Sequence, residues 1–494
     1  MLFERLKGLR LSDIQLQLGR DPGQELPAEG GEKGGTGGPS WTGPIDLDEV
    51  HRVRTIFLSS PKGLCPDGAR LSCRPVFVAE DLFVRSRVEP LQAVFTQWMA
   101  GAKAQVDGED VAFRKIINWC QDCADWRKRQ VLAREARALC RFLAPFSHAT
   151  WQALVAAVRE ELGYDSYLAY CQARRRMCLD EQAKRCRELL SSGRQAYLRA
   201  ADKWLNRVCP GRRLHEASRF DAIYLLGMRY MDHLARDTIS LDSAMEFFRR
   251  LGVSERKGLR VHMEGSPGRQ SFCVPVSIPG EVHLIVGPLA GWVDWEALFH
   301  EMGHAFSFIH TDPGLALEAR EFFLSGAVSE AFAFLFQRLA MNPVFLETLA
   351  RKDGVRALDE LSGMHELKFQ VLTRRYGAKF LIEYENFRKD RISSGQDLYA
   401  RIMGRETGFF YHPETYLFDL MPDFYSLDYF LAFVASGLLE KRLKTEFGKE
   451  WFRDGQAIET LKGWASVGNL YELDEFMKEV TGTRLWPEES ANAG

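Results

Sequence analysis

The chain has 494 residues, of which 46% are hydrophobic and 27% charged. A chain of this length and composition can bury more than one substantial core, which excludes disorder of the whole chain. The 65 Lys and Arg residues against 67 Asp and Glu residues give a formal net charge of −2, so no global field attracts nucleic acid or an anionic membrane.

The start of the chain does not have the pattern of a secretory signal. Residues 1–7 lack the apolar segment and cleavage site of a secretory signal, and no apolar run reaches the roughly 18 residues of a membrane span. We therefore expect a soluble, cytoplasmic protein that binds neither nucleic acid nor membrane. Its ten cysteines should then be mostly free thiols.

The first 44 residues form two segments. Apolar residues recur at roughly helical spacing over residues 2–18, which predicts an N-terminal helix within 1–19. Residues 20–44 are rich in glycine and cannot bury enough apolar surface to offset the entropy of ordering, so we expect a flexible linker.

A helical domain is predicted over 45–255, with helical patterns that include 111–117. Cys120 and Cys123 form a C-x-x-C pair inside this half, but one such pair is a weak indication of a metal site. The run Arg174–Arg176 has acidic neighbours and is interpreted as a solvated helix surface.

The character of the sequence changes in the second half, 256–494, which we interpret as the catalytic domain. Two short apolar runs at 271–277 and 281–286, separated by Pro279-Gly280, predict two strands joined by a turn. The strand at 281–286 is expected to form the sheet edge beside the helix that follows. From residue 294 to about 482 the pattern is helical again.

That following helix contains His300-Glu301-Met302-Gly303-His304. Four residues of an α-helix advance about 6 Å and turn almost once, so both imidazoles project from one face and can share one zinc ion. Glu301 can then take a proton from an attacking water. Glu296, one turn earlier, is a candidate acceptor for an imidazole N–H.

A catalytic zinc ion needs a third protein ligand. Glu330 opens a strongly apolar helical stretch, where an acid is unfavourable unless it is paired or bound to metal, and is therefore the predicted ligand. Glu318 and Glu321 are rivals in a more polar segment that fits a solvated face. His310 has the spacing of a three-histidine site, but Ser307 stands where such a site needs glycine.

These residues resemble the thimet oligopeptidase and oligoendopeptidase F family of zinc metallopeptidases. The resemblance rests on the segment 268–273, the strand pair and zinc helix, the glutamate about 25 residues beyond the second histidine, and the late tyrosine-rich segment 424–429. The stretch 161–168 also looks like a helical part of oligoendopeptidase F, so the similarity touches most of 150–440.

The resemblance implies a mainly α, neurolysin-like zincin fold, in which two helical lobes enclose a deep channel with a small β-sheet next to the zinc helix. It also implies one zinc ion, short peptide substrates and hydrolysis of internal peptide bonds with Glu301 as general base. Tyr425 and Tyr429 are the candidate phenols that donate to the developing oxyanion.

The chain departs from the family pattern and is identified as a divergent member. Ser307 replaces a frequent histidine, and the acids Asp419 and Asp423 stand near the place of another, with His412 out of register. Two alternatives stay open. One is a helical zinc carboxypeptidase, for which Arg374, Arg375 or Lys379 would bind a terminal carboxylate. The other is a catalytically silent binding protein with the same fold.

Overall fold

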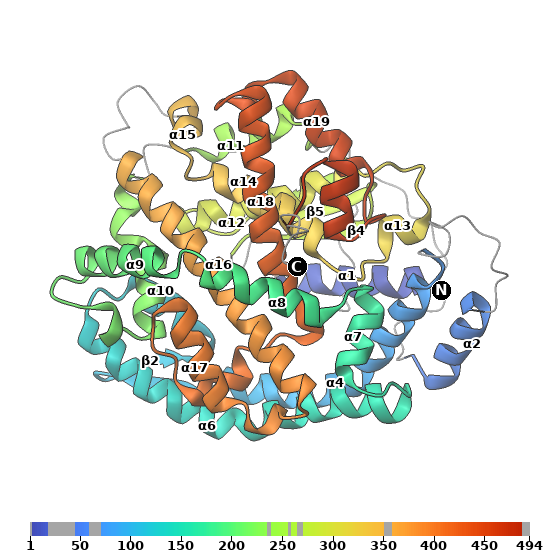
Figure 1. The fold of residues 1–494 in the computed structure, drawn as a ribbon, viewed down its shortest axis with the longest axis horizontal. Helices are drawn as coiled ribbons and strands as arrows, with labels where there is room; N and C mark the ends of the chain where they lie inside the picture. The colour runs from blue at the N-terminus through green and yellow to red at the C-terminus, as the bar shows by residue number, and fades with distance from the viewer. Residues whose placement is uncertain are drawn as a thin grey trace, which may run out of the picture. The chain divides into compact units, whose positions relative to one another are not determined.

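The computed structural model describes residues 2–17, 45–58, 71–234, 239–254, 258–263, 270–349 and 358–486. The glycine-rich stretch at 20–44 and the first residues of the segment 268–273 lie outside these ranges. The fold is mainly α with a small sheet next to the histidine-bearing helix, as predicted, and the described residues also contain a two-stranded sheet that was not predicted (Figure 1). Within the described part of the chain, no helix combines the length and the apolarity that crossing a membrane requires.

The chain divides into two compact units, each made of separate stretches. Unit 1 contains 1–79, 233–356 and 431–494, and unit 2 contains 80–232 and 357–430. Each unit therefore draws on both of the segments, 45–255 and 256–494, that the sequence distinguishes. The spatial division is not a division along the chain.

Unit 1 holds the three-stranded sheet and the helices around it. Its elements are α1 (Leu2–Gln17), α2 (Leu47–Leu58), α11 (Leu241–Arg250), β3 (Leu259–His262), β4 (Phe272–Ser277), β5 (Glu281–Ile285), α12 (Trp292–Ile309), α13 (Leu317–Glu321), α14 (Ala327–Leu339), α15 (Pro343–Leu349), α19 (Gly455–Ser466) and α20 (Leu473–Glu475), with most of α18 (Tyr425–Phe447).

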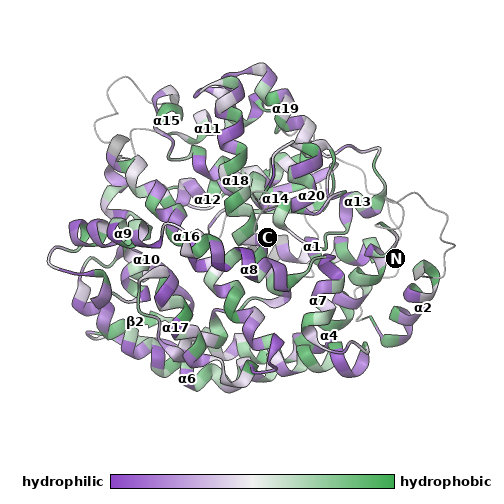
Figure 2. Cartoon of the chain, viewed as in Figure 1, coloured by the Kyte–Doolittle hydropathy of each residue, from purple (hydrophilic) through white to green (hydrophobic). Residues whose placement is uncertain are grey.

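Unit 2 is helical apart from one hairpin. Its elements are most of α4 (Arg74–Gly101), β1 (Lys103–Val106), β2 (Glu109–Ala112), α5 (Ile116–Asp122), α6 (Trp126–Ala156), α7 (Tyr167–Arg175), α8 (Leu179–Ser191), α9 (Arg194–Val208), α10 (Arg219–Gly227), α16 (Leu358–Arg388), α17 (Gln396–Thr407) and the first turns of α18. Its long helix α6 alternates hydrophobic and hydrophilic residues, as expected of a helix with one solvated face (Figure 2).

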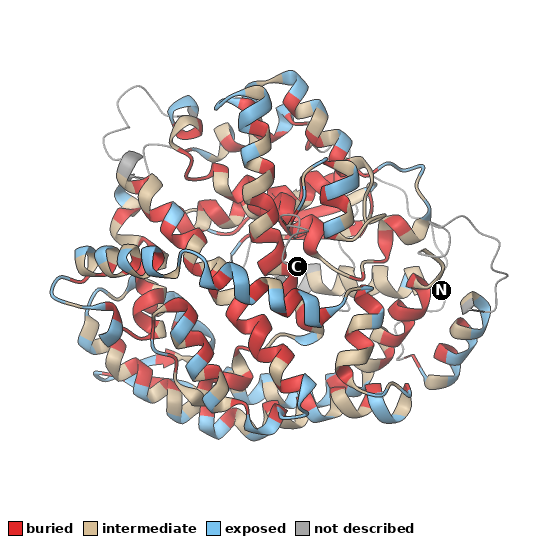
Figure 3. Ribbon diagram, in the orientation of Figure 1, coloured by how far each residue is buried: buried red, intermediate tan, exposed pale blue. Residues whose placement is uncertain are grey.

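The core of unit 1 forms where α12 packs against α14. Twelve residues of α14 are buried, among them Phe332, Phe334 and Phe336. Buried residues gather in the interior of the helical packing (Figure 3). The aromatic rings of Phe306 and Phe336 lie 5.1 Å apart across this interface, and those of Phe334 and Phe433 lie 3.8 Å apart toward α18. Such close packing of large side chains makes α14 a rigid support for whatever polar groups it carries.

The sheet confirms the predicted hairpin but corrects which strand lies at its edge. β4 pairs antiparallel with β5, and β3 pairs parallel with the other side of β5, in the order β3-β5-β4. The expectation that 281–286 forms the edge is therefore wrong, because β5 is the central strand. The other side of β5 pairs with β3, a four-residue strand that the sequence pattern does not predict. The edge strand beside α12 is β4.

The helical interpretation of 111–117 is wrong over its first part. Val111 and Ala112 belong to β2, which pairs antiparallel with β1. The turn between these strands is Asp107-Gly108, with φ of 49° and 85°. Asp-Gly is a favoured pair for a two-residue hairpin turn because both positions need positive φ, so local turn chemistry overrides the apparent helical pattern.

The run Arg174–Arg176 is not a solvated surface at its first two positions. Arg175 is 2% exposed and forms a buried ion pair with Asp428. Arg174 is also buried and pairs with Asp81 and, at 2.9 Å, with Asp423. These partners lie far along the chain, so the acidic neighbours in sequence do not indicate the environment of the two guanidinium groups.

The C-x-x-C pair binds backbone carbonyls within unit 2. The thiol of Cys120 is buried and donates to Phe220 O at 3.1 Å, and that of Cys123 lies 3.5 Å from Asp125 O. Among the described residues all nine cysteines are free thiols. Burial raises the pKa of the Cys123 thiol above its usual value, which does not favour a reactive thiolate.

Candidate metal centre

Helix α12 positions the two histidines on its one incompletely buried stripe. The helix begins after Gly291, where the carboxylate of Asp294 accepts hydrogen bonds from the N–H groups of Ala290 and Gly291 at 3.0 and 2.9 Å. Residues 294, 297, 300, 301 and 304 are half-buried, while most other residues of α12 are buried. This helical spacing leaves His300, Glu301 and His304 on a face that a ligand can reach.

Gly303 allows α14 to approach this helix closely. A Cβ atom at this position would lie 2.6 Å from Ala333 Cα and 2.8 Å from Phe332 O. Only glycine fits such an approach between two helix backbones. The middle of the histidine motif therefore determines how near the polar residues of α14 come to the two imidazoles.

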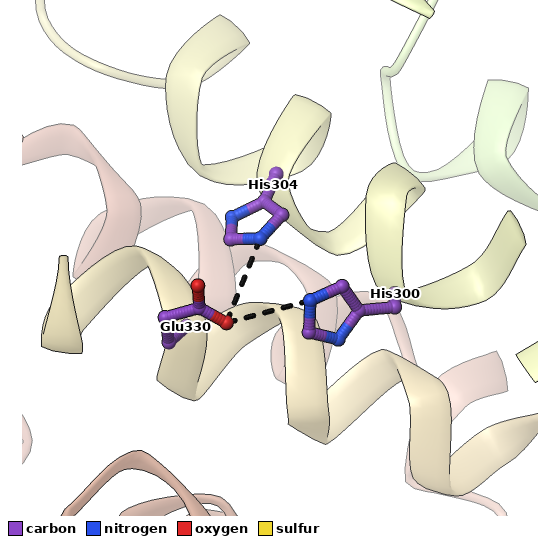
Figure 4. Close-up of side chains that lie close together, drawn as sticks. All are labelled: His300, His304 and Glu330. Carbon is purple, nitrogen blue, oxygen red and sulfur yellow. Dashed lines mark ion pairs between the residues drawn. The ribbon is translucent and has the colours of Figure 1, made fainter. Parts of the chain in front are cut away.

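The side chains of His300, His304 and Glu330 converge (Figure 4). Glu330 Oε2 lies 3.4 Å from His300 Nε2 and 3.7 Å from His304 Nε2. Ligand atoms about 2.05 Å from a tetrahedral zinc ion are about 3.3 Å apart. The carboxylate oxygen is close to this distance from each imidazole nitrogen, and the three donor atoms lie within 4.8 Å of one another. Within the described ranges this is the one group of three or more His, Cys, Asp or Glu residues that could hold a metal ion.

The other nitrogen of each imidazole has a partner on α14. His300 Nδ1 lies 3.0 Å from Gln337 Oε1, and His304 Nδ1 lies 2.7 Å from Ser329 Oγ. These contacts fix the orientation of both rings and point each Nε2 toward Glu330. Outer contacts of this kind are characteristic of histidines that bind metal. Gln337 and Ser329 are partners of the imidazoles that the sequence analysis did not name, and the contact proposed for Glu296, a buried residue of α12, stays a prediction.

The charge states of the site follow from burial and from the shared carboxylate. Burial lowers the pKa of His304 to about 4, against the opposing charge of Glu330. Burial acts in the same direction on His300, but the hydrogen bond and the charge of Glu330 outweigh it and raise the pKa of that imidazole. Glu330 lies nearer to His300, which accounts for the difference between the two rings.

The side chain of Glu301, on α12, contacts the edge strand β4. Its Oε2 accepts a hydrogen bond from the backbone N–H of Cys273 at 2.8 Å, and β4 thus orients the carboxylate. Burial raises the pKa of Glu301 to about 7, although the charge of His300 and the Cys273 N–H oppose the rise. A buried carboxylate that is held in one orientation can accept and return a proton.

The rival ligands have other contacts. Glu321 is buried, accepts from Ile278 N at 2.7 Å and pairs with Arg10 at 2.7 Å, so its interpretation as part of a solvated face is wrong. Glu318 is half-buried on the same short helix. His310 Nδ1 lies 2.9 Å from Phe306 O of its own helix. None of the three belongs to the converging group.

The candidate phenols lie at the start of α18, in unit 2. The rings of Tyr425 and Tyr429 are 5.0 Å apart and nearly perpendicular, and that of Tyr376 is 4.7 Å from Tyr429. All three are half-buried. The two tyrosines share one helical face, as the spacing predicts, and their part in catalysis stays a prediction.

The two acids near the tyrosines are engaged inside unit 2. Asp419 accepts from Tyr399 Oη at 2.8 Å and pairs with Arg375. Asp423 contacts Tyr167 Oη at 3.1 Å. Neither replaces the absent histidine as a donor, because a carboxylate in these contacts accepts hydrogen bonds.

Sequence reasoning missed Ser329 and Gln337. A signal for them exists, because both are polar in an otherwise apolar helix and Gln337 lies seven residues, or two turns, after Glu330. The contact of Glu301 with the Cys273 backbone has no such signal, since every residue except proline supplies an N–H.

No known protein-family model matches the chain, and no curated protein matches it either. Solved structures do match. PZ peptidase A with an inhibitor aligns with a TM-score of 0.65 at 12% identity, covering 90% of this chain and 82% of that one.

Two structures assigned as oligoendopeptidase F are similarly close. One, from Bacillus anthracis str. Ames, has a TM-score of 0.61 at 13% identity, and the other has a TM-score of 0.64 at 14% identity. Each alignment covers 90% of this chain and 81% of the other. At these identities the likeness concerns the fold. The chain thus has the fold of oligoendopeptidase F and PZ peptidase A, as the sequence resemblance implies.

Proposed function

We propose that the chain is a zinc-dependent oligopeptidase that hydrolyses internal bonds of short peptides. The observation that carries this proposal is the convergence of His300, His304 and Glu330 at distances that suit one tetrahedral ion. The peptidase fold of the similar structures supports the substrate class. When bound, a zinc ion supplies an activated water and polarises the scissile carbonyl.

Residues of the chain would carry out the proton transfers and bind the oxyanion. Glu301 accepts the proton of the attacking water and returns it to the leaving amine, from a carboxylate that Cys273 N–H holds in place. Tyr425 and Tyr429 are the proposed donors to the oxyanion. A peptide held mainly through its backbone would make few demands on side chains, which favours broad sequence tolerance.

The carboxypeptidase alternative gains no support from its candidate cations. Arg374 donates to Leu190 O at 2.7 Å and to Ser192 O at 3.1 Å. Arg375 pairs with Asp419, and Lys379 Nζ lies 3.5 Å from the same carboxylate. Each of the three cations is thus already engaged within unit 2.

The test is hydrolysis of an internally quenched peptide that is blocked at both ends. We expect cleavage by the wild type, loss with a chelator, and recovery when zinc is restored. Glu301→Gln should reduce the rate by about 10²- to 10⁴-fold and still bind zinc, whereas Glu318→Gln, on a neighbouring helix, should match the wild type. Cleavage that needs a free C-terminal carboxylate would favour the alternative. Metal binding without cleavage of any peptide would indicate a silent protein.

A further inference from the structure

The contacts around His304 continue beyond the imidazole. Ser329 Oγ, which lies 2.7 Å from His304 Nδ1, also lies 3.2 Å from Ser307 Oγ. Ser307 Oγ in turn donates to the backbone carbonyl of His304 at 2.9 Å. The chain of contacts therefore starts and ends on the same residue. Both serines are buried, each 7% exposed.

Only one placement of the hydrogen atoms makes all three of these contacts hydrogen bonds. Ser307 has one hydroxyl hydrogen, and the contact with the His304 carbonyl needs it, because a carbonyl oxygen only accepts. The contact between the hydroxyls must then use the hydrogen of Ser329. The contact with His304 is left to the ring, so the hydrogen there must sit on Nδ1.

This arrangement has a consequence for the metal site. A neutral imidazole that carries its hydrogen on Nδ1 presents the lone pair of Nε2, and Nε2 is the atom that lies 3.7 Å from Glu330 Oε2. The opposite tautomer would leave one of the three contacts without a hydrogen.

We propose that Ser307 and Ser329 are positioning residues that lock His304 in the tautomer protonated on Nδ1, so that its Nε2 is held ready for a metal ion. The proposal rests on the proposed metal site and adds two residues to it. They act through His304 and touch neither metal nor substrate. The outer partner of His304 is thereby a neutral hydroxyl, where a carboxylate is one of the usual choices.

The first test measures zinc affinity by competition with a chromogenic chelator, using the full chain. Ser329→Ala should weaken binding about 10- to 100-fold, the usual effect of losing such a partner. Ser307→Ala should weaken it less. The double variant should bind no more weakly than Ser329→Ala alone, because Ser307 acts only through Ser329.

Ser147→Ala is the matched control. Ser147 is a buried serine of unit 2 whose hydroxyl donates to Leu417 O at 3.4 Å, and its loss should leave zinc affinity unchanged. Affinity of Ser329→Ala within twofold of the wild type, or additive losses in the double variant, would overturn the proposal.

The second test needs no metal and thus separates this proposal from the proposed function. Nitrogen chemical shifts of histidine labelled with ¹⁵N report which ring nitrogen carries the hydrogen, and the His304→Gln spectrum identifies the signal. We expect Nδ1–H in the wild type and a mixture in Ser329→Ala. A wild type without zinc affinity would end the proposed function but not the tautomer lock, while a wild-type mixture of tautomers would end the lock alone.

Discussion

Glu383 is a buried acid of α16 whose surroundings make the stability of the protein depend on pH. The residue is 0% exposed, and its Oε1 accepts from Met421 N at 2.9 Å and from Ser426 Oγ at 2.7 Å. Burial raises its pKa to about 7, with Lys379 and these hydrogen bonds opposing the rise. The folded state therefore holds a proton that the unfolded state releases near pH 4.5.

The sign of the expected pH effect follows from this difference. Between about pH 4.5 and 7 the folded chain binds more protons at Glu383, so the free energy of unfolding should fall as pH rises, by at most about 1.4 kcal/mol per pH unit. Glu383→Gln keeps the shape and should remove this part of the slope. Urea titrations of both proteins at several pH values measure it. Equal slopes would show that Glu383 titrates as in the unfolded chain.

Arg10 of α1 forms an ion pair with an acid far along the chain, and this pair should contribute to the stability of the fold. Its guanidinium lies 2.7 Å from Glu321 Oε2 and donates to Glu321 O at 3.0 Å, and the side chain of Glu321 is fully buried. Removing the cation leaves a buried, uncompensated charge. We expect Arg10→Met to lower the free energy of unfolding by about 3–5 kcal/mol.

The double variant Arg10→Met/Glu321→Gln distinguishes charge from packing. It should recover much of the loss because no charge remains buried, although Glu321 Oε1 also accepts from Ile278 N. The readout is chemical denaturation of all three proteins. A double variant as unstable as the single one would assign the loss to contacts of α1 other than the ion pair.

At the scale of elements, the approach of α12 to α14 depends on one glycine. A methyl group at Gly303 would meet backbone atoms of α14 at 2.6 and 2.8 Å. Neither helix can yield locally, so Gly303→Ala should separate them, lower the free energy of unfolding by about 1–3 kcal/mol and weaken zinc binding. Gly463→Ala is the control: it lies inside α19 with nothing within 4 Å of the added Cβ.

The control should be neutral or stabilising by up to about 1 kcal/mol, because alanine favours a helix more than glycine does. Denaturant titrations and chelator competition on the two variants give both readouts. Wild-type stability and zinc affinity in Gly303→Ala would contradict the role assigned to this close approach.

The packing of α12 against α14 shows which parts of the site could be predicted from the sequence and which could not. The spacing of His300, Glu301 and His304 is a local property of one helix, and the acid Glu330 stood out in an apolar stretch, so this constellation could be predicted. The strand β3 could not, because four residues pair in parallel with β5 only after the chain has folded. The contact between Ser307 and Ser329 also spans two helices. Tertiary partners of this kind leave no local pattern.

At the scale of the whole molecule, metal binding should be linked to folding. The three donors come from α12 and α14, whose packing exists only in the folded state, so an ion that binds there stabilises that state alone. At a free zinc concentration 100 times the dissociation constant, the free energy of unfolding should rise by about 2.7 kcal/mol.

Glu330→Gln, which removes one charged donor and keeps its shape, should lose most of this gain at the same zinc concentration. Thermal unfolding of both proteins, with zinc and with chelator, measures the effect. The comparison is therefore made as the difference between zinc and chelator for each protein, and an equal zinc response in the two proteins would place the metal elsewhere in the chain.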